Sequence, residues 1–304
     1  MKITERTSKD GYKQAVYYWD EVKEPKGIIQ IAHGMNEHMA RYDWAAREFN
    51  KAGYIVAGGD HPAHGRTAGS RDKVGLAQGL DVYNLAVSNM RELSEELIQK
   101  YNLPLVLLGH SYGSYLSQTY FMRHSLIEGV KGIILSGSGL VDGASLTLGK
   151  TVCSLNKEDK PANFIKGLTF GAYDKKIKDG KNGWLTRDKA IVEAYNADEF
   201  IVDVFSYGFY KYFFRGLGEI FAKPSCEPKE LSIFFASGSM CGVGGYGKTI
   251  QKLYDKYIKL GFTNAKFKLY PDCRHELLNE LNRGEVIGDM TAFADGVIHS
   301  RPTR

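Results

Sequence analysis

The chain has 304 residues, of which 43% are hydrophobic and 25% are charged, and its formal net charge is +5. Such values are those of an ordinary soluble protein, and at this length we expect one α/β domain with an insertion. The lysines are scattered apart from a cluster at residues 175–181, so nucleic-acid binding is not indicated.

Short β-rich runs alternate along the chain with longer helical patterns. The runs predict strands at residues 15–19, 27–32, 54–57, 105–108, 130–135, 231–236 and 265–270. Apolar residues recur at steps of three and four between residues 83 and 97 and predict an amphipathic helix. Other helices are expected to begin near Trp44, after Tyr112, near Lys248 and near Glu285. This alternation predicts an α/β fold with a mostly parallel sheet flanked by helices.

The alternation stops between about residues 140 and 230. We therefore predict a core built from residues 1–139 and 231–304, with residues 140–230 inserted as a cap or lid. Residues 200–214 of this insertion are apolar on nearly all sides and include Phe205, Phe209 and Phe213. Such a segment either packs against other lid helices or lines a hydrophobic pocket, with transient contact to a membrane.

The first 20 residues carry charges and tyrosines without an apolar run, and no later segment approaches the about 18 apolar residues that span a membrane. The cysteines are Cys153, Cys226, Cys241 and Cys273, without a CxxC pair. This spacing argues against a zinc site and against a secreted disulfide framework. We expect a cytoplasmic protein that needs no metal and no organic cofactor.

The most informative segment is Gly109-His110-Ser111-Tyr112-Gly113, which follows an apolar strand and precedes a helical pattern. A Gly-x-Ser-x-Gly pentapeptide in this context is typical of a nucleophilic serine on a sharp strand-to-helix turn. The alternative is a glycine-rich turn with a bystander serine.

Serine chemistry needs a base and an oxyanion hole. His275 lies late in the chain after the last predicted strand, and the order serine before histidine is that of α/β-hydrolases. The backbone amide of Tyr112, directly after the serine, would supply one oxyanion donor. The amide of Met35, which follows the strand and His33-Gly34, would supply the other.

Several segments read as motifs: His33-Gly34-Met35-Asn36-Glu37-His38 with Arg41-Tyr42, Asp60-His61-Pro62-Ala63-His64-Gly65-Arg66, Gly109-His110-Ser111-Tyr112-Gly113, Trp184-Leu185-Thr186-Arg187-Asp188, Gly244-Gly245-Tyr246-Gly247 and Arg274-His275-Glu276. On these motifs, which extend over nearly the whole chain, the sequence resembles the monoacylglycerol lipases and lysophospholipases of the α/β-hydrolase superfamily, grouped with the serine aminopeptidase-like hydrolases. The resemblance implies ester hydrolysis through an acyl-serine, with Ser111 attacking, His275 relaying the proton, and the Met35 and Tyr112 amides holding the oxyanion.

One position departs from the family. The loop after the predicted strand at residues 231–236 carries Cys241 where the family has the aspartate that orients the histidine. A neutral thiol accepts hydrogen bonds weakly, and loss of the triad acid elsewhere costs on the order of 10⁴ in turnover. Three explanations stay open: Asp142 replaces the acid, Cys241 acts as a thiolate titrating near 8.5 or as a weak partner in a slow esterase, or hydrolysis is impaired.

The sequence thus supports two functions of different classes. The first is a serine hydrolase that cleaves monoacylglycerols, lysophospholipids or related acyl esters, with the lid aromatics roofing the acyl chain. The second is a non-catalytic ligand-binding protein that keeps the pocket while Cys241 silences the chemistry. Peptidase activity is a weaker option, because it requires a carboxylate in the pocket to bind a substrate amine.

Overall fold

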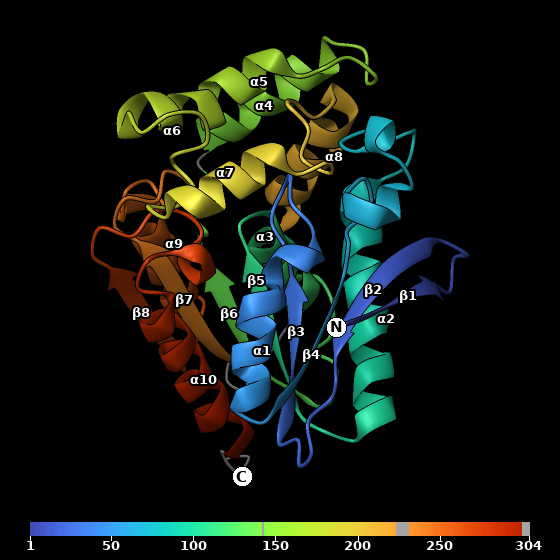
Figure 1. Ribbon diagram of the computed structural model, residues 1–304. Coiled ribbons are helices and arrows are strands. Elements are labelled where there is room, and N and C mark those ends of the chain that lie inside the picture. The colour runs from blue at the N-terminus through green and yellow to red at the C-terminus, as the bar shows by residue number, and fades with distance from the viewer. Residues whose placement is uncertain (142, 223–230, 300–304) are drawn as a thin grey trace.

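The computed structural model describes residues 1–141, 143–222 and 231–299. Its centre is an eight-stranded sheet in the order β1-β2-β4-β3-β5-β6-β7-β8 (Figure 1). The strands are β1 (Lys2–Thr7), β2 (Lys13–Trp19), β3 (Gly27–Ala32), β4 (Tyr54–Gly59), β5 (Leu105–His110), β6 (Val130–Ser136), β7 (Ser232–Gly238) and β8 (Ala265–Tyr270).

The six strands from β4 to β8 across the sheet pair in parallel, whereas β2 pairs antiparallel with both of its neighbours, β1 and β4. The predicted fold class is therefore confirmed, and each of the seven predicted strands is present. β1 was not predicted, because it is an edge strand in which only Arg6 is buried and its sequence lacks apolar alternation. Parallel pairing brings the loops that follow β3, β5, β7 and β8 to the same end of the sheet, where the carboxyl ends of these strands lie.

Helices cover both faces of the sheet (Figure 1). α1 (Asp43–Lys51) and α10 (Arg283–His299) pack on one face, and α2 (Val82–Tyr101), α3 (Tyr112–Met122) and α9 (Lys248–Lys259) pack on the other. Adjacent residues of a strand belong to the hydrophobic cores on opposite faces of the sheet, because successive side chains of a strand point to opposite faces. Ile28 belongs to the core under α2 and α3, and Ile29 belongs to the core under α1 and α10.

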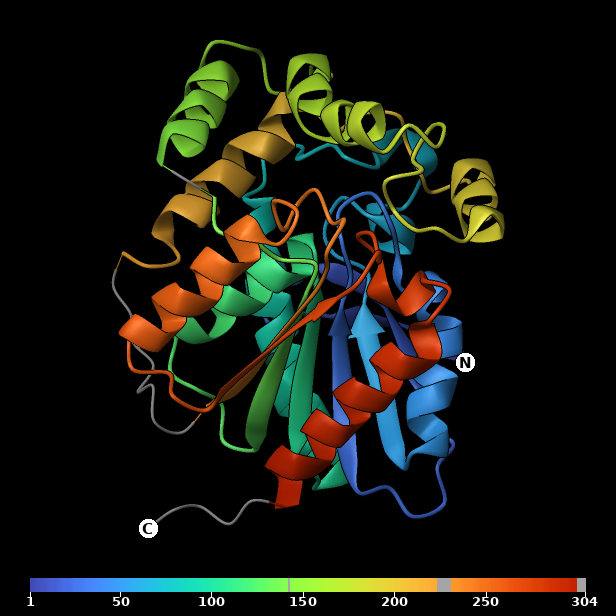
Figure 2. The same cartoon turned by 90° about the vertical axis from the view of Figure 1, so that its left-hand side faces the viewer.

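The chain between β6 and β7 contains α4 (Gly143–Ser154), α5 (Asn163–Leu168), α6 (Phe170–Ile177), α7 (Lys189–Ala197) and α8 (Tyr207–Glu219). We call this part the helical insertion. Figure 2 shows it above the carboxyl ends of the parallel strands, with α8 descending beside the core. α8 packs on α4 and on α2.

Some predictions fall where the structure gives no description. Cys226, Asp142 and the predicted boundary at residue 230 all lie outside the described residues. None of the helices within the described ranges is both long enough and apolar enough to cross a membrane.

Candidate active site

Ser111 lies at the sharp turn between β5 and α3, with φ +50° and ψ −116°. Non-glycine residues rarely adopt this conformation, and it persists only where surrounding contacts impose it. The Ser111 amide donates to the Ser136 carbonyl at 2.9 Å, and the Ser114 hydroxyl donates to the Ser111 carbonyl at 2.6 Å. The strained turn is thus bonded to the end of β6 and to the first turn of α3.

The glycines on either side of Ser111 are required by close packing. A Cβ atom on Gly113 would collide with the Ala32 carbonyl group at the end of β3. A Cβ atom on Gly109 would lie 2.6 Å from the Gly113 carbonyl oxygen. The Gly-x-Ser-x-Gly pattern therefore reflects the contact of β3 and β5 with the start of α3.

His275 follows β8, and its ring lies against Cys241 from the loop after β7. The distance from Cys241 Sγ to His275 Nδ1 is 3.1 Å, and the Gly244 amide donates to the same sulfur at 3.3 Å. Cys241 therefore stands at the position expected for the triad acid. The predicted alternative acid, Asp142, is outside the described residues.

Burial governs the charge of both side chains. It raises the pKa of the Cys241 thiol to about 11, although hydrogen bonding to the sulfur, first from the Gly244 amide, opposes the rise. It also lowers the pKa of His275 well below its ordinary value, and the nearby His110 lowers it further. A neutral thiol next to a neutral imidazole is therefore the resting state near pH 7, which argues against the thiolate that titrates near 8.5.

The two expected oxyanion donors come from the ends of neighbouring elements. Met35 follows β3, Tyr112 begins α3, and both line a cavity with Ser111. A Cβ atom on Gly34 would lie 3.2 Å from the Ser111 Cβ, so glycine permits this close approach. Within the described residues neither the Met35 nor the Tyr112 amide donates a hydrogen bond.

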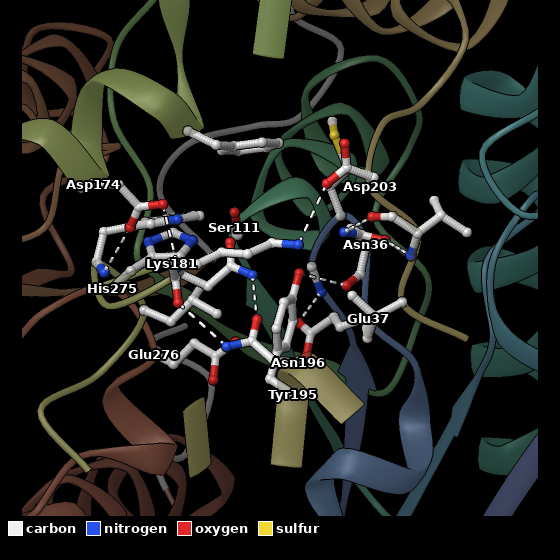
Figure 3. Close-up of a pocket in the computed structure, with 18 of the residues that line it drawn as sticks. Asn36, Glu37, Ser111, Asp174, Lys181, Tyr195, Asn196, Asp203, His275 and Glu276 are labelled. Carbon is white, nitrogen blue, oxygen red and sulfur yellow. Dashed lines mark hydrogen bonds and ion pairs between the residues drawn. The ribbon is translucent and has the colours of Figure 1, made fainter. Parts of the chain in front are cut away.

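Two cavities meet at Ser111. One, of about 370 Å³, is lined by polar side chains that include Lys181, Asn196 and Asp203, together with His275 (Figure 3). The other, of about 360 Å³, is lined mainly by apolar side chains of the helical insertion, such as Phe213. Both cavities include Met35 and Ser111. An elongated molecule with one polar and one apolar end would fit this shape.

A buried ion network joins the Met35 loop to the His275 loop. Arg41 Nη1 donates to Glu37 at 2.7 Å, and Arg41 donates through both Nη atoms to Glu276 at 2.7 Å. Glu37 also accepts from the Gly34 amide at 2.5 Å and from the Tyr42 hydroxyl at 2.8 Å. In the sequence, Glu37, Arg41 and Glu276 are recognisable only as positions within motifs. A structural role could have been suspected from the charged residues that follow the two site segments, since Glu37 and Arg41 follow Gly34 and Glu276 follows His275.

The helical insertion also holds the histidine loop. Its Leu185 carbonyl accepts from the Glu276 amide at 2.7 Å, and the Trp184 ring lies 4.9 Å from the His275 ring. Arg187 donates to the buried carboxylate of Glu280 at 2.8 Å. The segment from Trp184 to Arg187 thus packs directly on the residues that place the imidazole.

The buried histidines that follow β3 and β4 are hydrogen-bonded within the protein. His33 Nδ1 lies 2.8 Å from the Gly34 carbonyl oxygen, and His33 Nε2 accepts from the His61 amide at 2.9 Å. Burial lowers the pKa of His61 to about 3 and that of His64 to about 4, so both are neutral at pH 7. Among the described residues no three His, Cys, Asp or Glu side chains are placed to hold a metal ion.

Residues 23–282 match the family model described as serine aminopeptidase, S33. The chain is 25% identical over 280 residues to the monoacylglycerol lipase of Mycolicibacterium smegmatis, an alignment that covers 90% of both chains. It is 28% identical over 195 residues to the human monoglyceride lipase, covering 63% of this chain and 58% of that protein. A thermostable carboxyl esterase from Bacillus coagulans, solved with glycerol, superimposes with a TM-score of 0.84 at 26% identity over 98% of both chains.

Arg41→Met tests the buried ion network. The change leaves Glu37 and Glu276 buried without their cation, so the free energy of unfolding at pH 7 should fall by about 3–5 kcal/mol in urea titrations. Burial alone would raise the pKa of Glu276, but Arg41 holds that pKa below its ordinary value. The stabilisation is therefore complete above the unfolded pKa of about 4.3 and is lost as pH falls through the lower folded pKa.

Without Arg41, burial raises the pKa of Glu276 in the folded variant. The stability difference between Arg41→Met and the parent should accordingly shrink as pH falls from that raised pKa toward the lowered folded pKa of the parent. Arg47→Met is the matched control, because Arg47 forms an exposed ion pair with Asp43 on α1 and should change stability little. Equal losses in the two variants at pH 7 would contradict the role given to the network.

Proposed function

We propose that this chain, which belongs to the serine aminopeptidase S33 family of α/β-hydrolases, cleaves carboxylic esters through an acyl-serine on Ser111. The observation that carries the proposal is the strained turn that presents Ser111 in the same cavity as His275, beside the Met35 and Tyr112 amides. The relatives named as monoacylglycerol lipases and a carboxyl esterase support ester hydrolysis as the reaction class.

In the proposed reaction Ser111 Oγ attacks the ester carbonyl carbon and passes its proton to His275 Nε2. The carbonyl oxygen becomes an anion and accepts hydrogen bonds from the Met35 and Tyr112 amides. When the tetrahedral intermediate collapses, the alcohol leaves with the proton from His275. Water then attacks the acyl-serine with the same base, and the carboxylic acid and free Ser111 are released.

Cys241 has a restricted role in this scheme. His275 accepts a proton at Nε2 only when its Nδ1 carries a hydrogen, and Cys241 Sγ lies 3.1 Å from Nδ1 to accept it. A neutral sulfur stabilises the resulting imidazolium much less than a carboxylate would. We therefore assign to this chain a working but slow hydrolase.

The two cavities support an amphiphilic ester as substrate, such as a monoacylglycerol, a lysophospholipid or a related acyl ester. The acyl chain would occupy the apolar cavity under α4, α5 and α8, and the head group would occupy the polar cavity. In this proposal residues 140–230 act as the cap. Leu148, Phe164 and Leu168 rim the apolar cavity and are about half exposed, which supports transient membrane contact of the cap. The cytoplasmic location that the sequence favours belongs to the same proposal.

A second function is favoured by one observation, the neutral thiol in place of the triad acid. In that case the chain binds an acyl ester without turning it over. Reactivity of Ser111 separates the two functions, because a binding protein does not need an activated hydroxyl.

Ser111→Ala tests the proposed nucleophile. The parent should react with a fluorophosphonate probe at one site and hydrolyse p-nitrophenyl esters, and the variant should do neither, because the attacking oxygen is gone. Circular dichroism should show an unchanged fold. Residual turnover within about tenfold of the parent would point to another nucleophile, and an unreactive parent would favour the binding protein.

Cys241→Asp tests the acid position. An ionised carboxylate at this point should fix the Nδ1–H tautomer of His275 and stabilise the imidazolium, so kcat should rise by at least about tenfold. Cys241→Ser is the control, because serine is close to cysteine in size and its hydroxyl carries no charge. Burial raises the pKa of Cys241 to about 11, so any thiolate-dependent gain in the parent should begin above about pH 10. Unchanged kcat in folded Cys241→Asp would contradict the assignment.

Phe213→Ala tests the acyl-chain cavity. Phe213 lines the apolar cavity, whereas Phe205 and Phe209 are buried against His64 and do not line it. Of these three residues only Phe213 should therefore discriminate chain length. In Phe213→Ala, kcat/KM for a dodecanoate should fall relative to that for an acetate by a factor that corresponds to about 1–3 kcal/mol of activation free energy. Phe209→Ala should affect both esters alike. Equal losses for the two esters in Phe213→Ala would contradict the placement of the acyl chain in this cavity.

A further inference from the structure

Asn36, directly after Met35, links the loop between β3 and α1 to the helical insertion. Its side-chain Nδ2 donates to the Val202 carbonyl oxygen at 2.8 Å, and the Val202 amide donates to Asn36 Oδ1 at 3.0 Å. Asn36 lies at the wall of the polar cavity (Figure 3). One amide side chain thus satisfies both backbone groups of Val202.

The backbone of Asn36 adds a third bond to the same segment. Its carbonyl oxygen accepts from the Tyr195 hydroxyl at 2.9 Å. Its φ of +57° lies in the left-handed region, which asparagine tolerates better than most residues. A neighbouring contact, from His38 Nε2 to Asp198 at 2.8 Å, attaches the loop to the insertion at a second point.

Met35 therefore lies between two anchors of different origin. On one side the Gly34 amide is bonded to Glu37, whose partner Arg41 belongs to the core. On the other side Asn36 is bonded to Tyr195 and Val202 of the insertion. An oxyanion donor works only when it stands at hydrogen-bond distance from the oxygen of the transition state, so loosening either anchor should weaken it.

We infer that Asn36 is a positioning residue that fixes the Met35 amide for the oxyanion, so that the oxyanion hole is complete only while residues 195–202 are docked on it. The inference rests on the proposed function of Ser111 and Met35. It assigns to the insertion a part in the chemical step in addition to enclosing the substrate.

Asn36→Gly tests the inference, because glycine keeps the left-handed backbone and removes only the side-chain bonds to Val202. With p-nitrophenyl acetate, which does not reach the apolar cavity, kcat should fall by about ten- to a hundredfold while KM stays within about twofold. The affinity for a trifluoromethyl ketone, which forms an oxyanion with the serine, should fall by a similar factor. Asn102→Gly is the matched control, because Asn102 is exposed and left-handed, with φ +52°, at the end of α2.

Asn36→Asp is the second variant. It keeps the acceptor for the Val202 amide and loses the donor to the Val202 carbonyl, so its kcat should also fall, and a folded Asn36→Asp decides the matter if Asn36→Gly does not fold. Hydrogen exchange gives a readout that does not depend on catalysis: amides of residues 34–38 should exchange faster in Asn36→Gly than in the parent.

The outcomes separate this inference from the proposed function. An unchanged kcat, a loss confined to KM, or unchanged exchange at residues 34–38 overturns the role of Asn36. An inactive parent that does not react with fluorophosphonate overturns the proposed function, and the exchange measurement still shows whether Asn36 holds the loop.

Discussion

The close approach of three backbone segments behind Ser111 is the constraint on which the site depends. The end of β3, the end of β5 and the first turn of α3 are so near that a side chain at Gly113 would collide with the Ala32 carbonyl group. This packing imposes the positive φ of Ser111 and brings the Met35 loop beside it. The parallel sheet supplies the rigidity, because each of these segments is fixed by a strand that is buried on both faces.

Buried ion pairs fix the positions of the loops around that turn. Arg41 satisfies two carboxylates from segments that are distant in sequence, Glu37 and Glu276. Such a network specifies geometry more than it adds stability, because the desolvation of its members offsets much of the attraction. The same residues neighbour the proposed oxyanion donor at Met35 and the proposed base at His275. The loop after β3 and the loop after β8 are therefore fixed relative to each other.

The environment of Cys241 shows how burial decides chemistry. The sulfur is within hydrogen-bond distance of His275 Nδ1, the contact expected of a triad acid, yet full burial keeps the thiol protonated well above neutral pH. A carboxylate at this point would be held ionised by the Gly244 amide and an imidazolium, whereas a thiol gains less from the same donors. Cys241 thus has the position of a triad acid without its negative charge, and the proposed slow turnover follows from the missing charge.

Local patterns in the chain predicted seven of the eight strands, the helix at α2 and the turn at Ser111, because these depend on periodicity and on glycines that no other residue can replace. The position of His275 after Ser111 in the chain indicated the base, and the resemblance to a family with an aspartate in the loop after β7 drew attention to Cys241. The sequence by itself could not assign roles to Arg41 or Asn36, nor separate Phe213 from Phe209, because their partners lie far away in the chain. Only the tertiary structure brought those partners together, since ion pairs, amide bonds and cavity walls depend on which surfaces meet after folding.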